Sequence, residues 1–437
     1  MFNPELFADR RRRLMQMMRP NSLAIVPTSP VANYSHDTDY VFRAGSDFYY
    51  LTGFREPESV ALISTVDGKA PFTLFVRPRD PAKETWTGRR AGIEGAKDIY
   101  RADETFDIAE FRSKLATYLE NIDAIYHFPG RNRRFDRKLF KAWQEVRMKW
   151  RLGVDTPFEL IDLGHLMNEM RLFKTPADME FQVQACAITA EAVELAMRTV
   201  GPGQNEREIE AMVNHYFRTS GAFGPGFPTI VASGPNSVIL HYVENERDIR
   251  DGDLVLLDAG AEYEFFNGDI TRTFPANGKF TPEQRAAYEI VLTAQLRGIE
   301  LCTTDRTPNE MHDGTVRVLV EGMIHLGLIE GSVDETIEKK SYEKYYMHKT
   351  GHWLGVDVHD VGSYRKDKQW RRFEPGMVTT VEPGLYLPED DESLPAGFRG
   401  IGIRIEDDVH ITASGPENLT AMCPKRADEL EELTPRR

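Results

Sequence analysis

The first part of the chain alternates short apolar runs with a segment of helical periodicity. The runs SLAIVP (22–27), SVALIST (59–65) and FTLFVRP (72–78) are bounded by turn-forming residues and are predicted to be strands. The segment 106–122 places apolar residues at helical spacing. Strands that alternate with helices are typical of an α/β domain with a mixed sheet, which we expect over residues 1–172.

A second domain is expected over residues 173–437. Its start is marked by Thr175-Pro176, because threonine caps a helix and proline suits the first helical turn. A helical pattern then runs to about residue 200. Thr281-Pro282 repeats the signal ahead of a helix that ends near 301, and a further helix is predicted from 308 to about 326. Segments rich in predicted strands separate these helices, so the predicted class is α/β or α+β.

Two aspartates end or begin apolar segments that look like neighbouring strands. Asp258 follows the apolar run 254–257, and Asp269 comes after a predicted turn at 264–268. A hairpin through that turn would bring the two carboxylates close together. They would repel each other unless a positive charge lay between them.

Two glutamates complete an acidic set. Glu382 ends the apolar run before Pro383-Gly384, and Glu406 interrupts the apolar side chains of a predicted continuous strand over 401–412. Four buried carboxylates without cations would cost a domain several kcal/mol each, about enough to unfold it. With His352 they form an oxygen-rich set that suits hard or borderline divalent ions. Four negative charges balance two divalent cations about 3.5–4 Å apart.

Three histidines lie within the segment MHKTGHWLGVDVHD (347–360). The spacing of His348 and His352 would place both on one face of a helix, as in a zinc helix, but no glutamate follows His348. Two glycines and two β-branched valines in the segment favour a loop that leads into a strand. We therefore expect separate roles for these histidines and for His359.

Composition limits the class of partner. The net charge of −15 argues against nucleic acid or an anionic membrane as the main partner, and the basic run 10–13 is expected to be a solvated helix face. No segment approaches the roughly 18 apolar residues of a membrane span. Three separated cysteines fit a reducing compartment, and the first residues lack the apolar core of a signal peptide. A cytoplasmic location is expected.

The acids and His352, in this order, resemble the metal site of the pita-bread metallopeptidases, a family that includes methionine aminopeptidase, aminopeptidase P and prolidase. The surrounding motifs DAG, GDITRTF, VEPGLY and GIRIEDD match as well. The chain looks most like the aminopeptidase P (Xaa-Pro aminopeptidase) branch, because GSDFYYLTGFREPES, MRLFKTPAD, ILHYVEN and HWLGVDVHDVG extend the match over nearly its full length. The resemblance implies a creatinase-like N-terminal domain and a C-terminal pita-bread domain.

The resemblance also implies a ligand set. Asp258 would bind one metal, Asp269 and Glu406 would bridge both, and His352 and Glu382 would hold the second. The ions would be manganese, with zinc or cobalt as alternatives. Glu382 would also help to deprotonate a bridging water, which would act as a hydroxide nucleophile.

Further residues carry expected roles through the same resemblance. His241 and His359 would contact substrate carbonyls and the tetrahedral intermediate, His348 would line the pocket, and Arg404 would orient ligand carboxylates. Tyr386 would lie near the metals.

Three positions in the resemblance concern the rim of the site. Asp37 and Trp86, from the N-terminal domain, would reach toward the site, Trp86 from a neighbouring subunit. Lys349 replaces a glycine that is common in the family, and it would be strained if its φ were positive.

The expected activity is hydrolysis of the N-terminal X-Pro bond of peptides by a homodimer or homotetramer. The alternatives are a prolidase, which cleaves only X-Pro dipeptides, and a non-catalytic pita-bread binding module. Intact ligands disfavour the second alternative, and phosphoryl chemistry is disfavoured because no Walker-type loop is present.

Overall fold

The computed structural model describes residues 2–435, and it divides into two compact units that meet between Met170 and Arg171. Each unit is described by itself. None of the described helices is long and apolar enough to cross a membrane.

The first unit is built on one six-stranded mixed sheet with the strand order β6-β5-β4-β1-β7-β8. The strands β1 and β4 pair antiparallel, as do β4 and β5, whereas the other neighbours are parallel. The strand bounds are β1 (Ser22–Pro27), β4 (Val60–Ser64), β5 (Phe72–Val76), β6 (Glu104–Asp107), β7 (Ala124–His127) and β8 (Glu159–Asp162). The three predicted strands are therefore confirmed, and so is the mixed sheet.

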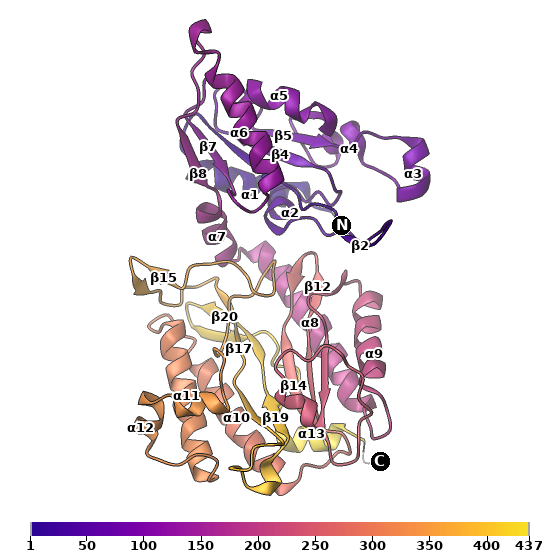
Figure 1. The fold of residues 1–437 in the computed structure, drawn as a ribbon, viewed down its shortest axis with the longest axis vertical. Helices are drawn as coiled ribbons and strands as arrows, with labels where there is room; N and C mark the ends of the chain where they lie inside the picture. Colours follow the sequence, from indigo (N-terminus) through magenta and orange to yellow (C-terminus); the bar gives the residue numbers. More distant parts are fainter. Residues whose placement is uncertain (1, 436–437) are drawn as a thin grey trace. The chain divides into compact units, whose positions relative to one another are not determined.

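Helices and a small hairpin complete the first unit (Figure 1). The segment 106–122 begins in β6 and becomes helical only afterwards, in α5. The helices are α1 (Pro4–Met17), α2 (Ser46–Thr52), α3 (Pro81–Thr87), α4 (Gly92–Asp98), α5 (Phe111–Tyr118) and α6 (Arg133–Arg147), and α7 (Gly164–Leu172) runs across the junction between the units. The hairpin consists of β2 (Asn33–Ser35) and β3 (Thr38–Asp39).

The basic run in α1 is only in part the solvated face that the sequence predicted, since Arg12 is exposed and Arg13 half-buried. Arg10 and Arg11 are buried, and their guanidinium groups donate to the backbone oxygens of Tyr50 and Leu51 at the end of α2. Cations at a helix C-terminus satisfy carbonyl groups that have no partner within the helix. The prediction was wrong for these two arginines because they connect α1 to the end of α2.

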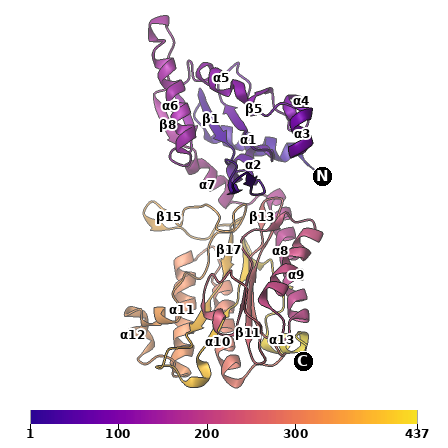
Figure 2. The same cartoon turned by 45° about the vertical axis from the view of Figure 1, so that its right-hand side comes forward.

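Long helices of the second unit pack in two pairs against its strands. Figures 1 and 2 show α8 and α9 on one side of the strands and α10 and α11 on the other. The helix bounds are α8 (Pro176–Thr199), α9 (Glu206–Thr219), α10 (Pro282–Glu300), α11 (Pro308–His325), α12 (Val333–Glu338) and α13 (Ala427–Leu433). Thr175 and Thr281 cap α8 and α10 as predicted, each in a reciprocal capping box.

The strands of the second unit form small sheets between those helix pairs. The larger ones have the orders β10-β11-β14, β13-β12-β9 and β17-β20-β21, and β18 pairs with β19. Their bounds are β9 (Gly224–Pro225), β10 (Ile230–Ser233), β11 (Leu254–Ala259), β12 (Ala261–Tyr263), β13 (Phe266–Asn267), β14 (Ile270–Pro275), β17 (Val378–Val381), β18 (Gly384–Leu387), β19 (Ile401–Arg404), β20 (Asp407–Thr412) and β21 (Gly415–Asn418). An exposed hairpin is formed by β15 (Arg365–Lys366) and β16 (Gln369–Trp370).

Candidate metal centre

The two aspartates lie on neighbouring strands, as the hairpin argument predicted. Strand β11 pairs antiparallel with β14, and Asp258 lies opposite Thr271, two residues beyond Asp269. The connection is itself the hairpin β12–β13, whose turn residues Glu264 and Phe265 have positive φ. The pairing therefore brings both carboxylates to the same end of the sheet.

The two glutamates occupy facing interruptions in a long ribbon. Glu382 and Pro383 separate β17 from β18, and opposite them Ile405 and Glu406 separate β19 from β20. The continuous strand predicted over 401–412 is therefore wrong. The chain changes partner there, from β18 to β17, and Glu406 leaves the pairing pattern at the change.

The segment 347–360 is a loop, which confirms the interpretation against a zinc helix. The Nδ1 atom of His352 lies 3.0 Å from the carbonyl oxygen of Trp353, so Nδ1 is the donor in this contact and Nε2 is directed elsewhere. That Nε2 atom lies 3.5 Å from Asp269 Oδ2 and 3.6 Å from Glu382 Oε1. The imidazole is thus oriented toward the carboxylates by its other nitrogen.

All five predicted ligands line one pocket of about 680 Å³. One potential ligand atom from each of Asp269, His352 and Glu406 lies within 4.8 Å of the others. This spacing is compatible with a shared cation.

The electrostatics of the pocket fit divalent cations. Burial, together with the neighbouring carboxylates, raises the pKa of Asp269 and of Glu406 well above their ordinary values. Burial also raises the pKa of Glu382. Asp258 Oδ1 is buried and has no hydrogen-bond partner among the described residues. Cations would balance these charges and satisfy this oxygen.

Arg404 connects two of the acids. Its Nη2 donates to Asp258 Oδ2 at 2.6 Å, and its Nε donates to Thr271 Oγ1 at 3.1 Å. The Thr271 hydroxyl in turn donates to Glu406 Oε2 at 2.7 Å. Arg404 therefore orients one acid directly and another through a threonine, which is how outer groups commonly fix metal ligands.

Tyr386 and His348 extend this chain of hydrogen bonds. Arg404 Nη1 donates to the Tyr386 hydroxyl at 3.0 Å, and that hydroxyl lies 2.8 Å from His348 Nε2. His348 Nδ1 faces the carbonyl oxygen of Lys349 at 2.8 Å and so carries the proton. Burial lowers the pKa of His348 to about 4, which keeps the ring neutral. Tyr386 is buried and is not among the residues that line the pocket.

His241 and His359 lie at the exposed rim of the same pocket. The ring of His359 packs edge-on against that of His352, with centroids 4.4 Å apart. Burial, and then His352, lowers the pKa of His359. Lys349 also lines the pocket, and it is not among the described residues with positive φ, so the strain considered from the sequence is absent.

Asp37 and Trp86 belong to the first unit. Asp37 is exposed between β2 and β3, and the Trp86 side chain on α3 is 88% exposed. Their contribution to the site stays a prediction.

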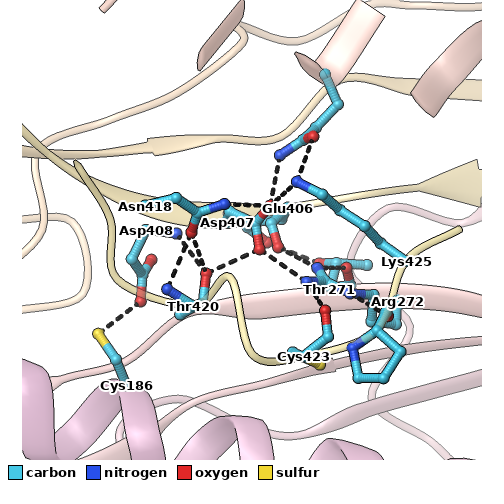
Figure 3. Close-up of polar contacts among 12 residues, drawn as sticks. Cys186, Thr271, Arg272, Glu406, Asp407, Asp408, Asn418, Thr420, Cys423 and Lys425 are labelled. Carbon is cyan, nitrogen blue, oxygen red and sulfur yellow. Dashed lines mark hydrogen bonds and ion pairs between the residues drawn. The ribbon is translucent and has the colours of Figure 1, made fainter. Parts of the chain in front are cut away.

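A buried polar network behind the site was missed from the sequence (Figure 3). Asp408 Oδ2 accepts from the backbone N–H of Asp269 at 3.0 Å and from the Cys186 thiol at 3.1 Å. Burial raises the pKa of Asp408 to about 7. Its neighbour Asp407 is also buried, but Arg272 and Lys425 outweigh the effect of burial and bring the pKa of Asp407 to about 2. The available signal was the row Glu406-Asp407-Asp408, which places three acids in succession.

Comparisons with known proteins cover the whole chain. Residues 182–413 match the model of metallopeptidase family M24, and residues 7–126 match that of the aminopeptidase P N-terminal domain. The Xaa-Pro aminopeptidase of Escherichia coli is 44% identical, over 98% of this chain and 97% of that protein. The Xaa-Pro aminopeptidase of Haemophilus influenzae is 42% identical over the same shares.

Solved structures give the same result. Pseudomonas aeruginosa aminopeptidase PepP has a TM-score of 0.97 and 45% identity, and it covers 99% of this chain and 98% of its own. A variant of Escherichia coli aminopeptidase P in complex with substrate has a TM-score of 0.95 and 42% identity, with the same coverage. These matches confirm the expected N-terminal domain and the pita-bread fold of the second unit. The chain therefore belongs to metallopeptidase family M24, in its aminopeptidase P branch.

Proposed function

We propose that the protein is a metal-dependent aminopeptidase that removes the first residue of peptides with proline in second position. The observation that carries the proposal is the convergence of five potential metal ligands and three histidines on one pocket. Relatives that align over nearly the full chain are named Xaa-Pro aminopeptidases.

In this proposal two divalent cations are held by the five ligands. Asp258 would hold one cation, Asp269 and Glu406 would be shared by both, and His352 and Glu382 would hold the other. Manganese is the proposed metal, with zinc or cobalt as alternatives. When bound, such ions polarise the scissile carbonyl and lower the pKa of water.

The protein side chains supply orientation and proton transfer. Glu382 accepts a proton from the attacking water, since its carboxyl group lies beside His352 and its pKa is raised above the ordinary value. His241 and His359, at the rim, donate hydrogen bonds to substrate oxygen atoms as negative charge develops. Arg404 keeps Asp258 in place, and neutral His348 forms part of the wall.

Proline at the second position defines the substrate class. The nitrogen of an X-Pro bond has no hydrogen, and the ring restricts the preceding residue. A peptide of this kind therefore needs a site that neither relies on this N–H nor requires a helical conformation before it. Asp37 and Trp86 are proposed to contact such peptides. Tyr386, predicted from the sequence to bind substrate as well, is buried and instead holds His348 and Arg404 behind the pocket wall.

A cleavage panel separates this function from its alternatives. The manganese-loaded chain is expected to cleave both X-Pro and X-Pro-Y peptides at the first bond. Cleavage of the dipeptides alone would support a prolidase. Failure to bind manganese, together with no cleavage, would support a binding module.

The location and assembly of the enzyme are proposed as well. The three cysteines are free and buried, which fits a cytoplasmic location. A homodimer or homotetramer is proposed from the resemblance. The domain ranges 1–172 and 173–437 are proposed from the helix start at Thr175-Pro176.

A further inference from the structure

Arg272 lies in β14 next to Thr271, and its side chain is fully buried. Side chains alternate along a strand, so Thr271 and Arg272 project to opposite faces. Each of the five N–H donors of an arginine finds an acceptor here. The acceptors are Pro424 O at 2.9 Å for Nε, Thr271 O at 3.0 Å and Glu406 O at 2.5 Å for Nη1, and Asp407 Oδ1 at 2.7 Å and Cys423 O at 3.0 Å for Nη2.

The bond to Glu406 O matters because Glu406 lies in the interruption between β19 and β20, outside regular strand pairing. A buried carbonyl without a partner is unfavourable, because it has lost its hydrogen bonds to water. Three hydrogen bonds with residues of β14 take the place of the regular strand pairing that Glu406 lacks. Thr271 O accepts from its backbone N–H at 3.0 Å, Thr271 Oγ1 donates to its side chain at 2.7 Å, and Arg272 donates to its carbonyl.

Asp407 fixes the guanidinium from the other side (Figure 3). Its Oδ1 accepts from Arg272 and from Thr420 Oγ1, and its Oδ2 accepts from Lys425 Nζ at 2.5 Å and from Gln295 Nε2 at 2.8 Å. Lys425 therefore belongs to the same ionic cluster. Its Nζ donates to Asp407 and Gln295, and neither of these bonds involves Glu406.

We propose that Arg272 is a positioning residue that fixes the backbone of Glu406, and through it the carboxylate that faces both metal positions, with Asp407 holding the guanidinium in place. This inference rests on the proposed function, because it takes Glu406 as a bridging ligand. Arg272 itself touches neither the substrate nor the metals. Its planar fork is what the role requires, since a lysine ammonium cannot reach carbonyls of three segments at once.

The test compares Arg272→Lys with Lys425→Met in the full-length protein. The first variant keeps the charge opposite Asp407 but loses the bond to Glu406 O. The second is the matched control, because it weakens the same buried cluster and leaves that bond intact. For each, manganese binding is measured by calorimetry, the coupled manganese pair by electron paramagnetic resonance, and the stability of the metal-free chain by urea unfolding.

The expected result is a loss of about tenfold or more in affinity for the weaker manganese site in Arg272→Lys, as is common when a group behind a ligand is changed. The signal of the coupled pair should decrease with it. Lys425→Met should keep its manganese affinity within about twofold of the unsubstituted chain, even if urea unfolds it as readily as Arg272→Lys or more readily. If manganese affinity falls in proportion to the loss of stability in both variants, the inference is overturned.

Two further outcomes are decisive. If Arg272→Lys does not fold, Asp407→Asn takes its place. This variant keeps one acceptor oxygen but removes the charge that holds the guanidinium, so weaker manganese binding is expected, and unchanged binding would overturn the inference.

If the unsubstituted chain binds no manganese and cleaves no X-Pro peptide, the proposed function fails and the inference fails with it. If the unsubstituted chain does both, only the role of Arg272 is at issue.

Discussion

Asp408 lies directly behind the site and should make the stability of the metal-free protein depend on pH. Its carboxyl group is buried, accepts from the Asp269 backbone and the Cys186 thiol, and leaves Oδ1 without a partner among the described residues. Burial raises its pKa from 3.8 to about 7. The informative substitution is Asp408→Asn, which keeps an acceptor for the Asp269 N–H and cannot ionise.

The direction of this pH dependence follows from the number of protons that the folded and unfolded states bind. Between about pH 4 and 7 the folded state holds a proton on Asp408 that the unfolded state has lost, so stability falls as the pH rises through this window. A difference of about 3 pKa units corresponds to a loss of about 4 kcal/mol in the free energy of unfolding. This loss is complete above about pH 7 and absent below about pH 4. Asp408→Asn lacks this fall. It should therefore be more stable than the unsubstituted chain at about pH 8, by up to about 4 kcal/mol.

Urea unfolding of the metal-free proteins, followed by circular dichroism from about pH 5.5 to 8, measures this difference. About half of the loss of about 4 kcal/mol should occur between about pH 5.5 and 8. Asp334→Asn is the control, because that side chain is 85% exposed and its loss of charge should leave the shape of the curve unchanged. Parallel curves for the unsubstituted chain and Asp408→Asn would refute the assignment of a raised pKa to Asp408.

Three other predictions follow from the site and the fold. Asp269→Asn should abolish peptide cleavage and reduce the manganese bound per chain, measured by metal analysis after dialysis, because a neutral amide bridges two cations poorly; near-normal turnover would contradict the bridging role. His359→Ala should lower kcat by about 10²–10³-fold while manganese stays bound, as expected for loss of a donor to developing charge; a loss of metal in step with activity would instead make His359 a ligand. Thr175→Ala should lower the free energy of unfolding by about 1 kcal/mol in urea titrations through loss of the α8 cap, and no change would show that the capping box contributes little there.

Local signals in the sequence were sufficient for much of the fold. The predicted strands at 22–27 and in the following runs, the capped starts of α8 and α10, and the pairing of β11 with β14 are all present. Each depends on residues close together in the chain, where turn chemistry and periodicity act directly. The position of Asp258 beside the start of β14 followed from such a hairpin.

The missed features depend on partners far away in the sequence. The alternation from Ile401 to Thr412 is broken only at Asp407, and this one acid does not reveal that pairing changes from β18 to β17 at Glu406. In the same way, Arg10 and Arg11 look solvated until the end of α2 is placed against them. The contacts of Arg272 join three segments that only the tertiary fold brings together.

The central claim is that this pocket is a metal-dependent peptidase site for X-Pro bonds. The most direct test is kcat/KM of the manganese-loaded, full-length protein on an X-Pro-Y peptide and on the X-Ala-Y peptide with the same end residues, with the released products identified by mass. We expect release of free X from X-Pro-Y, loss of this reaction after chelation, and far slower cleavage of X-Ala-Y. Equal rates on the two peptides, or no cleavage of X-Pro-Y with two manganese ions bound, would contradict it.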